Sequence, residues 1–336
     1  VSLVLSIAAL FMANDIFAFV KADAVKEITV SENTSVSSLA KELDDQGVIN
    51  YHSVFKLYLT LKHQTDTSVL AGAYQLNPSM DYGQIVDALA NTASTETVQI
   101  TIPEGYSISQ IRQVLLDNHI CTEDALDEVL NDYSFKHDFL EDEKPAAEGW
   151  LEGYLFPDTY EFYVKENADS ALSRLLANFQ DRIMDDPDLA PLIANSSYSL
   201  KEIVIMASLI EKESIGDDTE RKNISSVIHN RLENPSSEKG GRALQLCSTI
   251  NYIMKHDGVK TFDTEIDSPY NTYINPGLTP GPICNPGLSA IEAAIYPADT
   301  DYYFFALGKD GKSHFFTDYN EHLKFINSGE YQPIYS

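Results

Sequence analysis

Apolar residues between positions 26 and 91 alternate between the spacing of strands and the spacing of helices. The strand pattern covers 26–30 and 70–76, and the helix pattern covers 35–49, 53–62 and 80–91. The first of these helices places its apolar residues, Val36, Leu39, Ala40 and Leu43, on one face. Gly47 ends it. The segment is therefore predicted to fold as β-α-α-β followed by a third helix.

That order is typical of LysM-like carbohydrate-binding modules, and we assign such a module to residues 25–96. A spacer domain without a ligand is an equally open interpretation. Residues 97–148 are interpreted as a second small connecting lobe. Within it 97–102 predict a strand, 103–120 a strand, a turn and an amphipathic helix, and 121–148 an acidic, loosely helical stretch.

From residue 149 onward aromatic residues, glycine and proline become dense, and we assign the main domain to 149–336. Helices are predicted over 168–183, 199–214 and 220–233, the second of them opened by a capping box, Ser199 with Glu202. "DYYFFAL" and "SHFFT" flank an Asp-Gly turn and predict a β-hairpin. Helices and a hairpin segregated along the chain predict an α+β fold.

The helix predicted at 199–214 carries an acid on its apolar face. At about 100° per residue, Glu213 shares an arc with the large apolar residues of the last turns, Met206, Leu209 and Ile210, whereas Glu211 points elsewhere. A carboxyl among apolar side chains loses hydration, which raises its pKa and suits a general acid near neutral pH. The alternative is that Glu213 caps the helix or pairs with a base such as Arg221.

A second group of candidates lies in the proline-rich segment 268–287. Amide and hydroxyl side chains beside aromatic rings suit a groove that binds sugars. The candidate substrate-binding residues are Tyr270, Asn271, Thr272, Tyr273 and Asn275, with Gln245 from the segment 242–253. The alternative is a structural loop whose Asn and Thr side chains bond its own backbone.

The net charge and the spacing of cysteine and histidine limit which partners, metals and cofactors are expected. The formal net charge of −28 speaks against a nucleic-acid partner, because binding to phosphates requires a basic footprint. Neither the three cysteines nor the eight histidines show ligand spacing, so no metal site and no cofactor are expected. In an exported protein Cys247 and Cys284 can pair and leave Cys121 free; three buried thiols are an equal alternative.

Residues 1–20 are nearly all apolar apart from Asn14 and Asp15. About 20 apolar residues span a bilayer, so we expect a single-pass membrane anchor, truncated because no basic segment precedes it. A signal peptide cleaved at "ADA", 22–24, is the alternative. Either interpretation places residues 25–336 outside the cytoplasmic membrane.

Several blocks then carry a family resemblance. They are "EGWLEGYLFPDTYEF", "MASLIEKES…ERKNISSVIHNRL", "LQLCSTINYI", "SPYNTYINPGLTPGPICNPGLSAIEAAIYPA" and "YYFFALGKDGKSHFFT". In this order they resemble the MltG (YceG-like) family of endolytic murein transglycosylases, strongly over 150–322 and more loosely over 25–120. The resemblance implies a YceG-like catalytic domain on a membrane protein that cuts nascent peptidoglycan strands internally, with peptidoglycan synthases as candidate partners.

The resemblance also assigns roles to residues. It places the catalytic acid at Glu213, in agreement with the helical-face argument, and Glu213-Ser214 is similar to the Glu-Ser pair of lysozyme-like transglycosylases. Ser214 and Glu220 are further candidate substrate contacts. Many relatives carry Asp where Cys247 stands, so a second acid at that position is absent from this chain.

The reaction expected from the resemblance is lytic. Glu213 protonates the glycosidic oxygen between MurNAc and GlcNAc, and the resulting carboxylate then takes the proton of the MurNAc 6-hydroxyl, leaving a 1,6-anhydro end. A muramidase is the enzymatic alternative, but it normally needs a second carboxylate. Glu211 points away from Glu213, and Glu220 lies beyond a helix break expected at Gly216. A non-catalytic wall-binding scaffold is the alternative outside enzymology.

Overall fold

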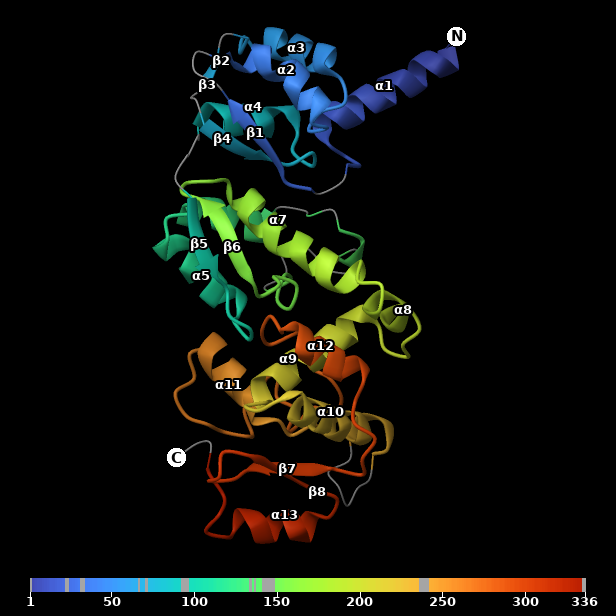
Figure 1. The fold of residues 1–336 in the computed structure, drawn as a ribbon, viewed down its shortest axis with the longest axis vertical. Coiled ribbons are helices and arrows are strands. Elements are labelled where there is room, and N and C mark those ends of the chain that lie inside the picture. Colours follow the sequence, from blue (N-terminus) through green and yellow to red (C-terminus); the bar gives the residue numbers. More distant parts are fainter. Residues whose placement is uncertain are drawn as a thin grey trace. The chain divides into compact units, whose positions relative to one another are not determined.

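The computed structural model of this 336-residue chain describes residues 2–21, 24–30, 34–65, 67–69, 72–91, 97–132, 135, 137–140, 149–235 and 242–333. The chain forms two compact units (Figure 1). Unit 1 consists of Val1–Ile102, Ser109–Leu151 and Asp158–Gln180, and unit 2 consists of Pro103–Ile108, Glu152–Pro157 and Asp181–Ser336. Both units combine helices with two-stranded antiparallel sheets, so the mixed α+β prediction is confirmed.

Unit 1 contains the small β-α-α-β segment that the sequence predicts. Its strands are β1 (Lys26–Val30), β2 (Thr34–Ser35), β3 (Ser68–Val69) and β4 (Gly72–Leu76), and its helices are α2 (Val36–Asp45), α3 (His52–Leu61) and α4 (Tyr82–Asn91). Strand β1 pairs with β4, and β2 with β3, over one shared apolar core. Residues 70 and 71 of the predicted second strand lie outside the described residues. The likeness to LysM modules and the domain boundaries stay predictions.

The rest of unit 1 is built on a strand pair that joins distant parts of the chain. Its elements are β5 (Thr97–Thr101), α5 (Ile108–Asp117), α6 (Glu123–Asp132), a 3₁₀ turn (Asp138–Leu140), β6 (Thr159–Tyr163) and α7 (Ala168–Phe179). Strand β5 pairs antiparallel with β6, from Thr97 opposite Tyr163 to Thr101 opposite Thr159. The strand predicted inside 103–120 is wrong, because the residues after β5 turn directly into α5.

The apolar N-terminal segment forms helix α1 (Ser2–Phe17). Its acid Asp15 is fully buried within unit 1, where its carboxylate accepts the backbone N–H groups of Asn50 and Tyr51 at 2.9 and 3.0 Å and pairs with Lys21 at 2.6 Å. These contacts tie the end of α1 to the module. Within the described ranges we find no helix with both the length and the apolar character needed to cross a membrane.

Unit 2 is organised around one buried helix. Its helices are α8 (Leu189–Ala194), α9 (Leu200–Glu213), α10 (Asp218–Glu233), α11 (Cys247–His256) and α12 (Leu288–Ile295), and one π-helical turn, Gln180–Met184, leads into the unit from α7. Helix α9 packs against α10, α11 and α12, and every residue from Ile203 to Ile210 is buried. The predicted capping box is confirmed: the Ser199 hydroxyl accepts the Glu202 N–H, and the Glu202 carboxylate accepts the Ser199 N–H.

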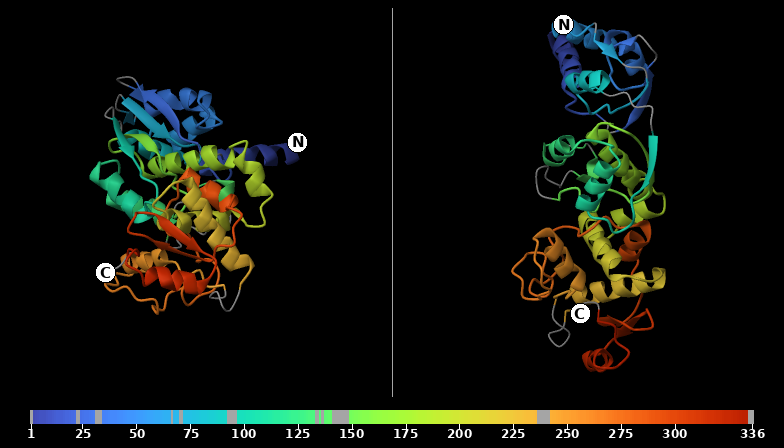
Figure 2. Two further views of the ribbon diagram at one scale, coloured as in Figure 1. Left: turned by 60° about the horizontal axis from the view of Figure 1, so that its bottom comes forward. Right: turned by 90° about the vertical axis from the view of Figure 1, so that its left-hand side faces the viewer.

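The C-terminal part of unit 2 is a hairpin covered by a helix. Strand β7 (Phe304–Leu307) pairs antiparallel with β8 (Ser313–Phe316), and the Asp-Gly turn between them holds Gly311 at φ +74°, a value that favours glycine. The predicted hairpin is confirmed. Helix α13 (Tyr319–Ile326), which the sequence analysis did not predict, packs on one face of both strands (Figures 1 and 2).

A buried polar cluster holds the short segments 103–108 and 152–157 in unit 2. The Asn285 amide oxygen accepts the N–H groups of Gly153 and Leu155, both at 2.9 Å, and its amide nitrogen donates to Glu152. The Glu152 carboxyl also accepts the Ile108 N–H at 3.0 Å, and burial raises its pKa to about 8. Distant segments therefore meet around one amide and one carboxyl.

Candidate active site

Glu213 is the last residue of α9, and the side chains that share its face are all buried. Met206, Leu209 and Ile210 have no exposed surface, as the helical spacing predicts. Glu213 itself is half-buried, and its Oε1 accepts the backbone N–H of Ser248 at 2.9 Å. Because Ser248 lies in the first turn of α11, the carboxyl lies at the positive end of that helix dipole.

The surroundings of Glu213 have opposite effects on the pKa of its carboxyl. Burial raises the pKa of the carboxyl above its ordinary value, since an ionised group loses hydration there. The Ser248 N–H and the positive charge of Arg231 oppose that rise, because both favour the carboxylate. A carboxyl with such balanced surroundings is suited to hold a proton and also to function without it.

Glu213 lines a cavity of about 400 Å³ within unit 2. The wall is formed by Glu213, Ile215, Arg231, Gln245, Cys247, Tyr273, Phe304, Phe305, Ala306, Leu307, Ser313, Tyr319, His322, Ile326 and Tyr331. Of the predicted site residues, Glu213, Gln245 and Tyr273 are thus brought together. Among the described residues of this wall, Glu213 is the single carboxylate.

Arg231 is a buried cation in the same wall, and the sequence analysis missed it. Its Nε donates to the carbonyl of Tyr303 at 2.8 Å and its Nη1 to the carbonyl of Leu244, while its guanidinium lies 5.6 Å from the centre of the Phe304 ring. These contacts fix the charge on the cavity side of α10. Burial lowers the pKa of Arg231 to about 10, although the Glu213 carboxylate opposes that change.

Cys247 and Tyr273 form a second polar pair in the cavity. The thiol sulfur and the phenol oxygen are 3.0 Å apart, and burial raises the pKa of both groups. Both groups are therefore neutral hydrogen-bonding groups near neutral pH. Cys121, Cys247 and Cys284 are all free thiols, so the alternative of a pair between Cys247 and Cys284 is not realised.

Gln245 reaches the cavity from a backbone conformation that is rare for its residue type. Its φ is +50°, in the left-handed region, and its N–H donates to the Thr272 carbonyl at 3.0 Å. Its side chain is exposed. Backbone strain of this kind often accompanies a functional side chain that must be aimed in one direction.

The other polar candidates of the proline-rich segment bond the protein itself. The Asn271 amide donates to the carbonyls of Thr264 and Ile266, and the Asn275 amide donates to those of Ser268 and Asn271. The Thr272 hydroxyl accepts the Leu246 N–H at 3.0 Å. These contacts match the structural-loop alternative. They hold the backbone that presents Tyr273, and none of the three side chains lines the cavity.

Three further candidates lie outside the cavity wall. The Tyr270 ring packs against Tyr252, with centroids 4.8 Å apart. Glu220 accepts a hydrogen bond from the wall residue Ser313 at 2.7 Å, and Ser214 directly follows Glu213 as the C-cap of α9. A sugar-binding role for these residues stays a prediction.

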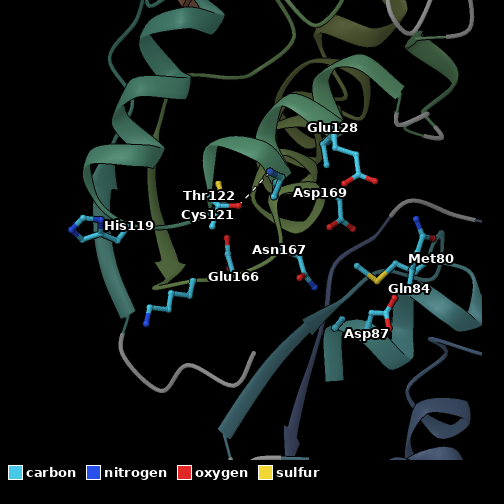
Figure 3. A pocket seen from close by; sticks show the side chains of 15 residues that line it. Met80, Gln84, Asp87, His119, Cys121, Thr122, Glu128, Glu166, Asn167 and Asp169 are labelled. Atoms are coloured by element: carbon cyan, nitrogen blue, oxygen red, sulfur yellow. Dashed lines mark hydrogen bonds between the residues drawn. The ribbon is translucent and has the colours of Figure 1, made fainter. Parts of the chain in front are cut away.

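A larger cavity of about 730 Å³ lies in unit 1 (Figure 3). It holds several acids, among them Asp87, Glu128, Glu166 and Asp169, which the figure shows on its sides. The Glu166 carboxylate is bonded by Arg174 through both oxygens, at 3.1 and 3.2 Å. No predicted catalytic residue lies in this cavity. In the described part of the chain, no group of His, Cys, Asp and Glu is arranged to hold a metal ion.

Comparison with known proteins gives one consistent result. The model of the YceG-like family matches residues 28–328. An endolytic murein transglycosylase of Bacillus subtilis (strain 168) is 34% identical over 310 residues, covering 88% of this chain and 82% of that protein. One from Streptococcus pneumoniae serotype 2 (strain D39 / NCTC 7466) is 30% identical, over 90% of this chain and 58% of that protein.

A solved structure has the same fold. The crystal structure of a yceG-like protein from Listeria monocytogenes aligns with a TM-score of 0.56 at 30% identity, over 90% of this chain and 100% of that one. The family match spans parts of both units and includes every wall residue of the cavity that holds Glu213 except Tyr331. The chain therefore belongs to the YceG-like family.

Proposed function

We propose that this protein is an endolytic murein lytic transglycosylase in which Glu213 is the single catalytic acid and base. The observation that carries the assignment is the cavity in unit 2, where Glu213 is the one carboxylate of the described wall. The named activity of the Bacillus and Streptococcus relatives supports the reaction class. The substrate is the glycan strand of peptidoglycan.

In the first step the protonated Glu213 donates to the glycosidic oxygen between MurNAc and GlcNAc. Burial raises the pKa of Glu213 and so favours the protonated form that a general acid requires. Because one carboxyl oxygen accepts the Ser248 N–H, the other can carry the proton that is transferred. The bond from C1 to the leaving oxygen breaks, and the substrate's own N-acetyl group assists the electron-poor C1.

In the second step the Glu213 carboxylate removes the proton of the MurNAc 6-hydroxyl, and the 6-oxygen bonds to C1. The proton given up in the first step is thus recovered, and no water is consumed. The Ser248 N–H at the start of α11 and the charge of Arg231 stabilise the carboxylate between the two steps. The product is a 1,6-anhydro end.

The wall of the cavity favours this lyase over a hydrolase. A glycoside hydrolase normally uses two carboxylates at a defined separation. Here Glu220 is engaged by Ser313, and Glu211 accepts the Gly287 N–H at 3.2 Å. Gln245 and Tyr273 supply an exposed amide and a phenol beside Glu213, which suit the N-acetyl group and hydroxyls of a sugar.

Digestion of purified peptidoglycan tests the assignment. Wild type is expected to release fragments with 1,6-anhydro ends by mass spectrometry, and Glu213→Gln is expected to release none while keeping the wild-type fold. Glu211→Gln, two residues earlier and on another side of α9, is the matched control and should retain cleavage. Fragments with reducing ends would identify a muramidase, and strand binding without any fragments would identify a wall-binding scaffold.

We also propose that residues 1–20 attach the protein to the cell membrane as a single-pass anchor, with the catalytic unit on the extracytoplasmic side where peptidoglycan lies. The exposed apolar side chains of α1 support attachment: Leu10 is 70% and Phe11 60% exposed. Leu10→Glu combined with Phe11→Glu should move the protein from the membrane to the soluble fraction. We likewise propose that the LysM-like module binds glycan and that the protein contacts peptidoglycan synthases.

A further inference from the structure

The hairpin of unit 2 has one face covered by α13 and one that is not. Phe304 and Phe316 contact His322 of α13 through their rings, and His314 and Phe316 contact Phe325. Because side chains alternate along a strand, Phe305, Leu307, Ser313 and Phe315 occupy the opposite face. Three of these four residues, Phe305, Leu307 and Ser313, line the cavity that holds Glu213, which residues of the covered face and of α13 also line.

Phe315 is the fourth residue of that face, and it lies outside the cavity wall. It lies directly opposite Phe305 in the strand pairing, and the two ring centroids are 6.0 Å apart. Tyr302 stacks on the other side of the row, 5.4 Å from Phe315 with an angle of 29° between the rings. All three side chains are half-buried, so each presents part of its surface to solvent.

The backbone beneath this row is held rigidly. The Asn230 amide of α10 donates to the carbonyls of Thr300 and Tyr302 at 2.8 and 2.9 Å. Arg231, the next residue, donates to the carbonyl of Tyr303. Helix α10 therefore fixes the backbone at the start of β7 relative to the cavity, which lowers the entropy cost of presenting Tyr302 and Phe305 to a ligand.

We propose that Phe305, Phe315 and Tyr302 form an aromatic strip on which pyranose rings of a glycan strand stack as the strand leaves the catalytic cavity. The inference rests on the proposed function. A cavity of about 400 Å³ is near the lower end for ligand pockets, so a long strand must continue along the neighbouring surface. Flat aromatic faces bind the apolar faces of sugar rings, and a strip open at its outer end suits cleavage inside a strand.

The decisive variant is Phe315→Leu, because leucine keeps the apolar packing of the hairpin and removes the flat ring. Peptide-free glycan strands, sorted by length, are the substrate. We expect KM on long strands to rise about fivefold to tenfold, with a smaller rise on short fragments that fill only the cavity. Phe315→Tyr should restore the wild-type KM, and Tyr296→Leu, which changes an exposed aromatic outside the cavity wall, should leave KM unchanged.

A Phe315→Leu enzyme with wild-type KM on long strands would show that the row only packs the hairpin. If Phe315→Leu loses its thermal transition, Tyr302→Leu at a loop position is tested instead. We expect the same rise in KM on long strands, and an unchanged KM would contradict the strip. Wild type that releases no fragments would contradict the proposed function instead. The strip would then be tested by binding alone: weaker binding of long strands to Phe315→Leu than to wild type would support it, and equal binding would contradict it.

Discussion

The cavities described in unit 1 and unit 2 each contain a glutamate near an arginine, buried in unit 1 and half-buried in unit 2, yet they differ in what the glutamate can do. In unit 1 both oxygens of Glu166 are bonded by Arg174, at 3.1 and 3.2 Å. In unit 2 Glu213 has one backbone N–H donor, and Arg231 donates to carbonyls rather than to Glu213. Burial raises the pKa of both acids.

The difference teaches that burial alone does not make an acid catalytic. Both oxygens of Glu166 are occupied by a bidentate guanidinium, so neither is available to a ligand. The cavity of Glu166 is the larger and the more acidic one, at about 730 against about 400 Å³. A free carboxyl oxygen, rather than cavity size, therefore distinguishes the proposed active site.

The largest expected effect comes from exchanging each glutamate for its amide. Glu213→Gln should lower the rate of fragment release by about 10³-fold or more, since one residue serves as acid and as base. Glu166→Gln should leave the rate within about twofold, because this carboxylate lies in another cavity and is already held by Arg174, and it should stay folded because the amide keeps one acceptor for Arg174. Rates on peptidoglycan and thermal unfolding measure both.

Glu213→Gln is also expected to change how the stability of the protein depends on pH. A folded carboxyl with a raised pKa keeps its proton longer than the unfolded chain does, so wild type loses stability as pH rises above the ordinary carboxyl range. Glu213→Gln removes this loss. Its stability relative to wild type should therefore be greater at neutral than at acidic pH, and a constant difference would contradict the burial argument.

Arg231 is expected to have the next largest effect. Without its charge the Glu213 carboxylate is less favoured, so Arg231→Met should move the alkaline limb of the pH–rate profile upward by about one pH unit. Arg231→Lys should keep the limb near its wild-type position. Cys247, Tyr273 and His322 also border this cavity, and their retention in both variants makes the comparison a test of the one charge.

Loss of activity in both variants, with unchanged limbs, would instead assign Arg231 a purely structural role. Its hydrogen bonds to the carbonyls of Tyr303 and Leu244 make some loss of stability certain in Arg231→Met, on the order of 1–3 kcal/mol. The position of the limb does not depend on that loss, because it is measured on the folded fraction.

The sequence predicts those site residues whose place depends on neighbours along the chain, and it does not predict those that depend on contacts between distant segments. The position of Glu213 follows from helical spacing alone, seven residues after Met206. The same spacing places Arg231, seven residues after Ile224, on the apolar face of α10. Ser248 could not be identified in this way, because it meets Glu213 only when α11 packs against α9.

The candidate sugar-binding residues of the segment 268–287 are predicted to line a groove, but several of them bond the protein itself. Asn271, Thr272 and Asn275 carry the groups that bind sugars, yet in the structure they bond backbone of the same loop or its neighbour. An Asn beside prolines has the same local sequence in either role, so no pattern separates them. The hairpin was predicted correctly as an element, but its place in the cavity wall depends on contacts with α10 that are distant in sequence.

A smaller effect, on stability rather than rate, is expected at the buried cluster of unit 2. Burial raises the pKa of Glu152 to about 8, so the folded state loses stability between the ordinary carboxyl range and pH 8. Since each pKa unit corresponds to about 1.4 kcal/mol, Glu152→Gln should remove a loss on the order of a few kcal/mol. Thermal unfolding at pH 5 and pH 8 measures it, with the exposed Glu265→Gln as control.

The smallest effect is expected at Cys247, whose thiol bonds the Tyr273 phenol at 3.0 Å. Cys247→Ser replaces the thiol by a hydroxyl that can still bond the Tyr273 phenol, so it should change the rate by less than about threefold. Cys247→Asp adds a negative charge near Glu213, which raises the pKa of that carboxyl and moves the alkaline limb upward, by less than Arg231→Met does.

Cys247→Asp also tests whether one carboxylate defines the reaction. The variant has two acids in the cavity wall, the number that hydrolysis normally uses. We expect its products to keep 1,6-anhydro ends, because a hydrolase also needs a water held between its carboxyls, and the substrate's 6-hydroxyl is already in place next to C1. Reducing ends from Cys247→Asp alone would show that the lack of a second acid, rather than the arrangement around Glu213, makes the wild type a lyase.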